Sequence, residues 1–192
     1  QDIMGKSRLI MVSNRLPLKP VVDDDGHPTG DFTMSSGGLV TALRGVKDEL
    51  DFIWVGWIGE EIPLEKQDGL REKLLKDHNC LPVFLSDELV IKYYNGFSND
   101  VLWPLFHYVP LPMYKVGGER KFDTDLWEAY KEANRLFAEA IMSIYTKTDL
   151  IWVHDYHLMR LPAELRQRER DCQVAWFLHT PFPTSEIYRM LP

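Results

Sequence analysis

The sequence of 192 residues contains only two cysteines, Cys80 and Cys172, and they lie far apart. Neither belongs to a CxxC pair or to a Cys/His spacing that is typical of a zinc site. This cysteine usage favours a protein of a reducing compartment without structural zinc. We expect both thiols to be small buried side chains.

Long apolar runs are also missing. No stretch approaches the ~20 apolar residues of a membrane-spanning helix, and the amino-terminal segment QDIMGKSRLIM lacks the charged-then-apolar order of a signal peptide. The net charge is −7, and neither sign of charge forms a long block, so a nucleic-acid partner is not expected. We therefore expect a cytoplasmic protein with neither a membrane nor a nucleic acid as partner.

Common nucleotide and metal motifs are absent as well. The sequence has no P-loop, no GxGxxG and no HExxH, so nothing indicates ATP, a dinucleotide or a zincin site. It also has no low-complexity tract and no linker rich in Pro, Gly or Ser. Because 45% of the residues are hydrophobic, the chain should fold as one globular domain.

What the sequence does contain is a series of short apolar runs of strand length. They are continuous rather than alternating, as strands of a parallel sheet covered on both faces tend to be. The runs are RLIMVS (8–13), FIWVGW (52–57), LPVFL (81–85), LIWVH (150–154) and VAWFLH (174–179).

Helical patterns separate several of these runs. Apolar residues recur at three-to-four spacing in 39–50 and 123–145, which predicts a helix in each segment. Another helix should begin after residue 157, and Thr184 is the expected N-cap of a last helix. Alternation of strands and helices predicts a doubly wound, mainly parallel α/β sheet with right-handed crossovers. The irregular stretches 14–36 and 109–122 are expected to be surface loops.

In such sheets, ligands bind beyond the carboxyl ends of the strands. The segments that follow the five runs should therefore share one rim. They are Asn14–Arg15, Ile58–Glu61, Ser86–Glu88, Asp155–His157 and Thr180–Thr184.

Three features near this rim have both an ordinary and a functional interpretation. The SSGG segment (35–38) could let backbone N–H groups approach a phosphate, although a Gly-Gly helix start is more often only a tight turn. Arg15 is either a surface arginine or a phosphate clamp. The aromatic stretch YYNGFSNDVLWPLFHY (93–108) is mostly core by composition, but Tyr and Trp can also stack on sugar rings.

The segment HDYH (154–157) follows the fourth run. Two histidines and an aspartate could bind zinc, yet no third strong ligand follows at a standard spacing. The alternative is that Asp155 is a strand-tip carboxylate that accepts hydrogen bonds, with His154 partly buried. His179 ends the next run, so a pocket shared by the two strand-end histidines is a further possibility.

The motifs VSNRLP, SSGGLVTAL, WVGWIGEE, YYNGFSNDVLWPLFHY, IWVHDYHLMRLPAELR and FLHTPFPTSEIYRMLP occur in this order. Together they closely resemble the amino-terminal half of trehalose-6-phosphate synthases, which are retaining glycosyltransferases with the two Rossmann-like domains of the GT-B fold. The resemblance runs from about Arg8 to Pro192. It implies transfer of glucose from UDP-glucose to glucose 6-phosphate, giving α,α-trehalose 6-phosphate and UDP, without a metal or cofactor.

The resemblance also implies roles for individual residues. Arg15 and Tyr94 match residues that meet the acceptor phosphate, Trp57 and Trp103 match residues of the acceptor site, and Asp155 matches the residue that takes sugar hydroxyls. Gly38 and His179 match contacts of the donor, and the catalytic residues implied are Asp155 and His179. In this family the leaving phosphate is thought to help deprotonate the incoming hydroxyl. The absence of an evident pair of catalytic carboxylates agrees with that.

The family pattern continues beyond Pro192, into a second domain that carries the Arg and Lys for the UDP diphosphate. We therefore expect residues 1–192 to be an incomplete amino-terminal, acceptor-side Rossmann-like domain that is inactive alone. The alternative is a catalytically silent synthase-like domain that is regulatory or binds sugar phosphate, for example fused to a trehalose-phosphate phosphatase. A zinc hydrolase built on HDYH is a third hypothesis. A homo-oligomer or a trehalose-synthesis complex is a possible assembly.

Overall fold

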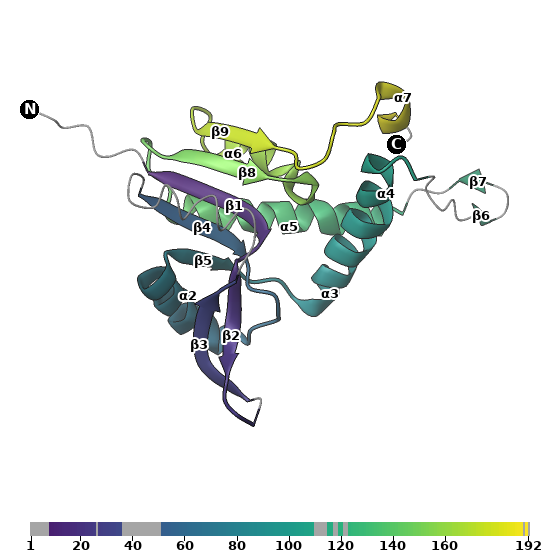
Figure 1. The fold of residues 1–192 in the computed structure, drawn as a ribbon. Coiled ribbons are helices and arrows are strands. Elements are labelled where there is room, and N and C mark those ends of the chain that lie inside the picture. Colours follow the sequence, from purple (N-terminus) through teal and green to yellow (C-terminus); the bar gives the residue numbers. More distant parts are fainter. Residues whose placement is uncertain are drawn as a thin grey trace, which may run out of the picture.

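The computed structural model describes residues 8–25, 27–35, 51–109, 115–116, 119–120, 123–189 and 191. A sheet of five strands lies at its centre, and all neighbouring strands in it run parallel (Figure 1). The strands are β1 (Leu9–Arg15), β4 (Phe52–Trp57), β5 (Cys80–Val83), β8 (Leu150–His154) and β9 (Gln173–Phe177). The prediction of five strands is therefore confirmed.

The strand order is β5-β4-β1-β8-β9. The chain starts in the middle with β1, builds outward through β4 and β5, and then crosses to the other side for β8 and β9. This is the doubly wound arrangement that the sequence predicts. The central strand β1 is apolar on both faces because both faces are covered: Ile10 and Val12 on one face and Met11 on the other are fully buried.

The predicted helix at 123–145 and the helices expected after residue 157 and at Thr184 are present. The longest, α5 (Thr124–Met142), runs along one face of the sheet (Figure 1) and begins at Asp123, whose carboxylate accepts hydrogen bonds from the N–H groups of Asp125 and Leu126. The predicted helix at 39–50 lies outside the described residues. Three helical segments follow β8: the 3₁₀ turn η2 (Tyr156–Leu158), α6 (Leu161–Arg168) and α7 (Ser185–Tyr188).

The stretch 14–36 is not the loop that we expected. Its described part forms an antiparallel hairpin of β2 (Leu18–Val22) and β3 (Pro28–Met34), which projects away from the sheet (Figure 1). The carboxylate of Asp23 orders the turn by accepting the N–H groups of Asp25 and His27. The sequence concealed this hairpin because its strands do not alternate between apolar and polar residues. In 109–122 the described residues form the short pair β6 (Lys115–Val116) and β7 (Glu119–Arg120).

Helix α2 (Leu64–His78) was not predicted, because it is mostly charged and Leu74 is its one fully buried residue. The aromatic stretch is also helical, and it lies beyond the carboxyl ends of the strands (Figure 1). At Gly96 a side chain would bring its Cβ within 2.6 Å of the Leu126 side chain. The missing side chain therefore allows this region to pack closely on α5. Its elements are α3 (Asp87–Val90), the π-helix η1 (Ile91–Leu102) and α4 (Trp103–Phe106).

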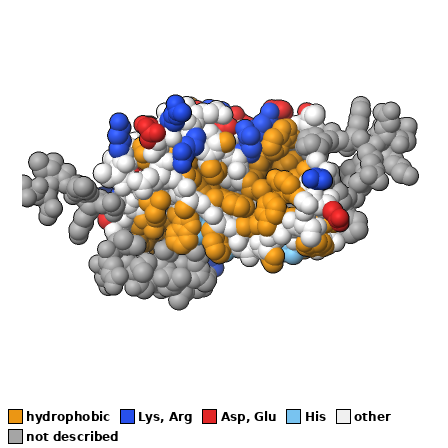
Figure 2. Space-filling view, turned by 90° about the horizontal axis from the view of Figure 1, so that it is seen from above, with side chains coloured by type: hydrophobic (Ala, Val, Ile, Leu, Met, Phe, Trp, Pro, Cys, Tyr) orange, Lys and Arg blue, Asp and Glu red, His pale blue; other side chains and the backbone are white. Residues whose placement is uncertain are grey.

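Both cysteines are buried, as predicted, and burial raises the pKa of Cys80 to about 12. The molecule still exposes hydrophobic side chains on one side (Figure 2), which in Figure 1 is the side of β9. Phe177 on β9 and Phe182 in the segment after it are 49% and 54% exposed. Among the described helices, none is both long and apolar enough to cross a bilayer.

Candidate functional site

The carboxyl ends of β1 and β8 lie side by side at the point where the strand order reverses. Ligands of doubly wound sheets bind at this point, because the connections on its two sides leave in opposite directions. Arg15 is the last residue of β1, and Asp155 directly follows β8. Two predicted site residues thus stand on the two strands that flank the expected ligand position.

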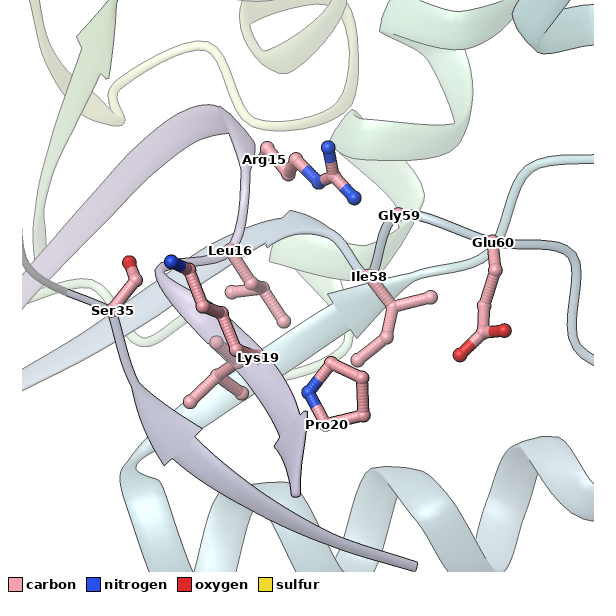
Figure 3. A pocket seen from close by; sticks show the side chains of 9 residues that line it. Arg15, Leu16, Lys19, Pro20, Ser35, Ile58, Gly59 and Glu60 are labelled. Atoms are coloured by element: carbon pink, nitrogen blue, oxygen red, sulfur yellow. The ribbon is translucent and has the colours of Figure 1, made fainter. Parts of the chain in front are cut away.

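Arg15 lines a cavity of about 390 Å³ between β1, β2 and the segment after β4 (Figure 3). Two cations, Arg15 and Lys19, and one carboxylate, Glu60, belong to its wall, so the cavity carries a net positive charge that favours an anion. The remaining lining residues are Leu16, Leu18, Pro20, Ser35, Ile58 and Gly59.

Backbone geometry places the Arg15 side chain. Gly59 has a φ of +108°, and a Cβ at this position would lie 2.8 Å from Nε of Arg15. Gly56 similarly leaves room for the end of β1, since a Cβ there would lie 2.7 Å from the backbone nitrogen of Leu16. The motif WVGWIGEE therefore supplies two glycines where the end of β1 and its arginine need space.

Arg15 and Trp57 pair with one another at an irregularity in the β1–β4 register. The guanidinium carbon of Arg15 lies 5.4 Å from the centroid of the Trp57 ring, which is a cation–π contact. Trp57 is 7% exposed, and its buried Nε1 has no hydrogen-bond partner among the described residues. A buried donor without a partner is costly, so this indole N–H is available to a ligand.

The next ring in this series is Tyr94, from η1. Its centroid lies 6.2 Å from that of Trp57, and it stacks on His157 of η2 at 5.7 Å. The neighbouring Tyr93 holds η1 in place, because its hydroxyl donates to Oδ1 of Asn14 over 2.8 Å. Side chains from β1, β4, η1 and η2 are thus brought together by contacts between residues far apart in the sequence.

Asp155 has an unusual backbone for a residue other than glycine, with φ +73° and ψ 174°. Several hydrogen bonds hold it there. Its N–H donates to the Phe177 carbonyl over 2.7 Å, its carbonyl accepts from Trp176 Nε1 over 3.1 Å, and its carboxylate accepts from the N–H of Tyr156 over 3.0 Å. Strain of this kind persists where the surrounding structure imposes it, often at functional sites. The half-buried carboxylate keeps further lone pairs for a ligand.

Three histidines accompany Asp155. Burial lowers the pKa of His154 to about 4, with a smaller contribution in the same direction from His179. Burial also lowers the pKa of His157 to about 4, although the charge of Asp155 opposes the shift. Both imidazoles are therefore neutral near pH 7. His154 and His179 are within hydrogen-bond distance, so the two strand-end histidines do meet as the sequence suggested.

Two predicted residues are not part of this series of contacts. Trp103, at the start of α4, is 45% exposed and stacks on His107 at 4.2 Å. Gly38 lies outside the described residues. Sequence reasoning also missed Lys19 as a cavity residue, because the hairpin that carries it was expected to be a loop, whereas Ser35 belongs to the SSGG segment that it had singled out. The Asp-Gly pair at the end of DDDG, a common hairpin-turn signal, could have revealed the hairpin.

The described residues offer one group in which three possible metal ligands lie within 4.8 Å of one another. This group is Asp23, Asp25 and His27, which are exposed in the β2–β3 turn. The HDYH side chains do not form such a group among the described residues.

Comparison with known proteins agrees with this architecture. The sequence model of glycosyltransferase family 20 matches residues 7–192. The chain belongs to this family. It is 52% identical over 192 residues to the alpha,alpha-trehalose-phosphate synthase [UDP-forming] of Emericella nidulans, covering 98% of the chain and 36% of that relative. It is 51% identical to the Schizosaccharomyces pombe protein of the same name, covering 100% and 36%. The family-20 chain thus spans little more than a third of the length of these relatives.

Solved structures confirm the Rossmann-like fold of this family-20 chain. One is described as trehalose-6-phosphate from E. coli bound with UDP-2-fluoro glucose, with a TM-score of 0.71, 33% identity, and coverage of 97% of this chain and 36% of that one. Another is the N-terminal domain of a Candida albicans trehalose-6-phosphate phosphatase, with a TM-score of 0.72, 27% identity, and coverage of 100% and 37%.

Proposed function

We propose that the full-length protein transfers glucose from UDP-glucose to glucose 6-phosphate with retention, giving α,α-trehalose 6-phosphate and UDP. Two relatives that are 52% and 51% identical to this chain over the aligned residues bear the name of that synthase. The observation that carries the proposal is the series Arg15, Trp57, Tyr94 and His157, which ends beside Asp155 at the reversal of the strand order. It combines a cation, aromatic faces and a carboxylate, which a sugar phosphate requires.

Three members of the series each suit one part of glucose 6-phosphate. The planar fork of Arg15 can bind two phosphate oxygens, and the Tyr94 hydroxyl can donate to a third. The unpartnered Nε1 of Trp57 can donate to a sugar hydroxyl. Asp155 accepts hydrogen bonds from acceptor hydroxyls, and we assign Trp103 to the outer part of the same site.

Transfer needs a correctly placed nucleophile and stabilisation of the leaving phosphate more than it needs a strong base. In this scheme Asp155 orients the acceptor hydroxyls, His179 contacts the transferred glucose, and Gly38 is assigned to the donor diphosphate. No side chain of the chain must form a covalent intermediate. The described segment would hold most of the acceptor site and little of the donor site, so we expect residues 1–192 alone to be inactive.

The alternative of a silent synthase-like domain attached to a phosphatase is less well supported. The identity to the Candida albicans phosphatase domain is 27%, whereas the identity to the Emericella nidulans synthase is 52%. All the expected residue types are also present at the proposed site. A homo-oligomer or a trehalose-synthesis complex remains a prediction.

The test has two parts, both on the full-length protein. The first measures formation of trehalose 6-phosphate from UDP-glucose and glucose 6-phosphate. The second measures glucose 6-phosphate binding by calorimetry for wild type, Arg15→Ala and Asp155→Ala. Loss of a charge-assisted contact should weaken binding by roughly 1.5–3 kcal/mol.

Arg170→Ala is a matched control, because Arg170 is exposed in the turn between α6 and β9. It should bind like wild type. Absence of trehalose 6-phosphate would contradict the reaction. Unchanged binding in both site variants would show that the acceptor site lies elsewhere.

A further inference from the structure

His154 and His179 stand at the carboxyl ends of neighbouring strands and share one hydrogen bond. Nδ1 of His154 lies 3.0 Å from Nε2 of His179, and the ring centroids are 5.2 Å apart at an angle of 27°. His154 is 2% exposed, whereas His179 is exposed. A ring held inside the protein is thus attached to a ring that reaches the surface.

The surroundings of His154 fix its orientation. Its ring lies 4.6 Å from the Trp152 ring and 6.2 Å from the Phe177 ring, so aromatic groups limit its rotation. Burial keeps it neutral, with a pKa lowered to about 4. A neutral imidazole has one N–H and one bare nitrogen, so His154 can either donate to His179 or accept from it.

The other ring nitrogen distinguishes the two arrangements. If His154 accepted at Nδ1, its own proton would be on Nε2, which is buried and has no acceptor among the described residues. If His154 donates from Nδ1, Nε2 is bare and no buried N–H is left without a partner. Orphaned buried donors are rare in proteins, so the second arrangement is favoured.

We infer that His154 is a positioning residue, which donates from Nδ1 to Nε2 of His179 and so leaves His179 with its own proton on Nδ1. His179 then offers an N–H donor at Nδ1 to an oxygen of the transferred sugar or of the leaving phosphate. It cannot accept a proton at Nε2 without breaking the contact with His154. The functional part of this inference rests on the proposed glucose transfer.

The tautomer is tested first, on the full-length protein labelled with ¹⁵N-histidine and assigned with His154→Asn and His179→Ala. The nitrogen shifts of wild type should show His179 neutral and protonated at Nδ1. A proton on Nε2 of His179 would overturn the inference. This measurement needs no turnover, so it does not depend on whether the protein transfers glucose.

Kinetics test the consequence. His154→Leu removes the donor and should lower kcat at least tenfold while the KM for glucose 6-phosphate stays within twofold. His154→Asn retains an N–H near the position of Nδ1 and should recover most of the loss, which a merely structural role of the imidazole would not predict. If His154→Leu fails to fold, His154→Asn still decides: a kcat as low as that of His179→Ala contradicts the inference.

A double-mutant comparison completes the test. In a His179→Ala background, His154→Leu should cause no further loss of kcat, because the group that it positions is gone. A full additional tenfold loss would contradict the inference while leaving the proposed glucose transfer intact.

Discussion

The guanidinium carbon of Arg15 lies 5.4 Å from the centroid of the Trp57 ring, where the last residues of β1 and β4 pair across a register irregularity. No carboxylate forms an ion pair with Arg15 among the described residues. An aromatic face and the open space at Gly59 place this cation without neutralising it. Its charge therefore remains available for a phosphate.

Gly59→Ala should weaken binding of glucose 6-phosphate by about 1–3 kcal/mol, because the new methyl group displaces the Arg15 side chain. Calorimetry on the full-length protein measures this. Gly69→Ala in α2 is the matched control, since a Cβ at Gly69 meets no atom within 4 Å. The control should bind normally and gain about 0.5–1 kcal/mol of stability as a helical alanine. Equal binding by both variants would mean that Gly59 does not place Arg15.

Asp155→Gly and Asp155→Ala should both lose acceptor binding but differ in stability. Both remove the carboxylate, and only glycine relieves the positive φ of +73°. The glycine variant should therefore be about 1 kcal/mol more stable in urea unfolding than the alanine variant. An alanine variant as stable as the glycine variant would show that the backbone at Asp155 carries no strain.

Gly96→Ala should destabilise the protein by about 1–3 kcal/mol, because its Cβ would overlap the Leu126 side chain, with 2.6 Å between the atoms. Denaturant unfolding of the full-length protein measures the loss. Gly96→Ala combined with Leu126→Ala should recover part of it, since the smaller side chain makes room. Additive losses in the double variant would contradict the packing explanation.

Asp149 should make stability depend on acid pH. Burial raises the pKa of its carboxyl, but hydrogen bonds from Arg8 and Thr146 outweigh this effect and hold the pKa below its ordinary value. A depressed pKa contributes stability above the unfolded-state value of about 3.9, and this contribution is lost as pH falls through the folded-state pKa.

Asp149→Asn should therefore cost about 1–3 kcal/mol near pH 7 and show a smaller further loss on acidification than wild type. Urea unfolding at a series of pH values measures both effects. Parallel pH profiles for the two proteins would rule out Asp149 as a source of acid sensitivity.

The sequence by itself predicted the parts of the fold that depend on local burial. Continuous apolar runs identified all five strands, and in β1, β4 and β5 burial on both faces explains why no side is polar. The strand-end rule then placed Arg15 and Asp155 at one edge, and the family motifs gave them roles. Sequence reasoning missed the β2–β3 hairpin and α2. Little of either element is buried, so Lys19 in β2 and the charged residues of α2 interrupt the regular spacing of apolar residues that identifies a strand or a helix.

Only the tertiary structure decided which side chains meet. The pairing of Arg15 with Trp57, the strained backbone of Asp155 and the contact between His154 and His179 depend on the strand order β5-β4-β1-β8-β9. A local pattern shows which residues are buried but not which distant segment covers them. The site is built from such distant contacts, so its geometry follows from packing of the whole sheet rather than from any one motif.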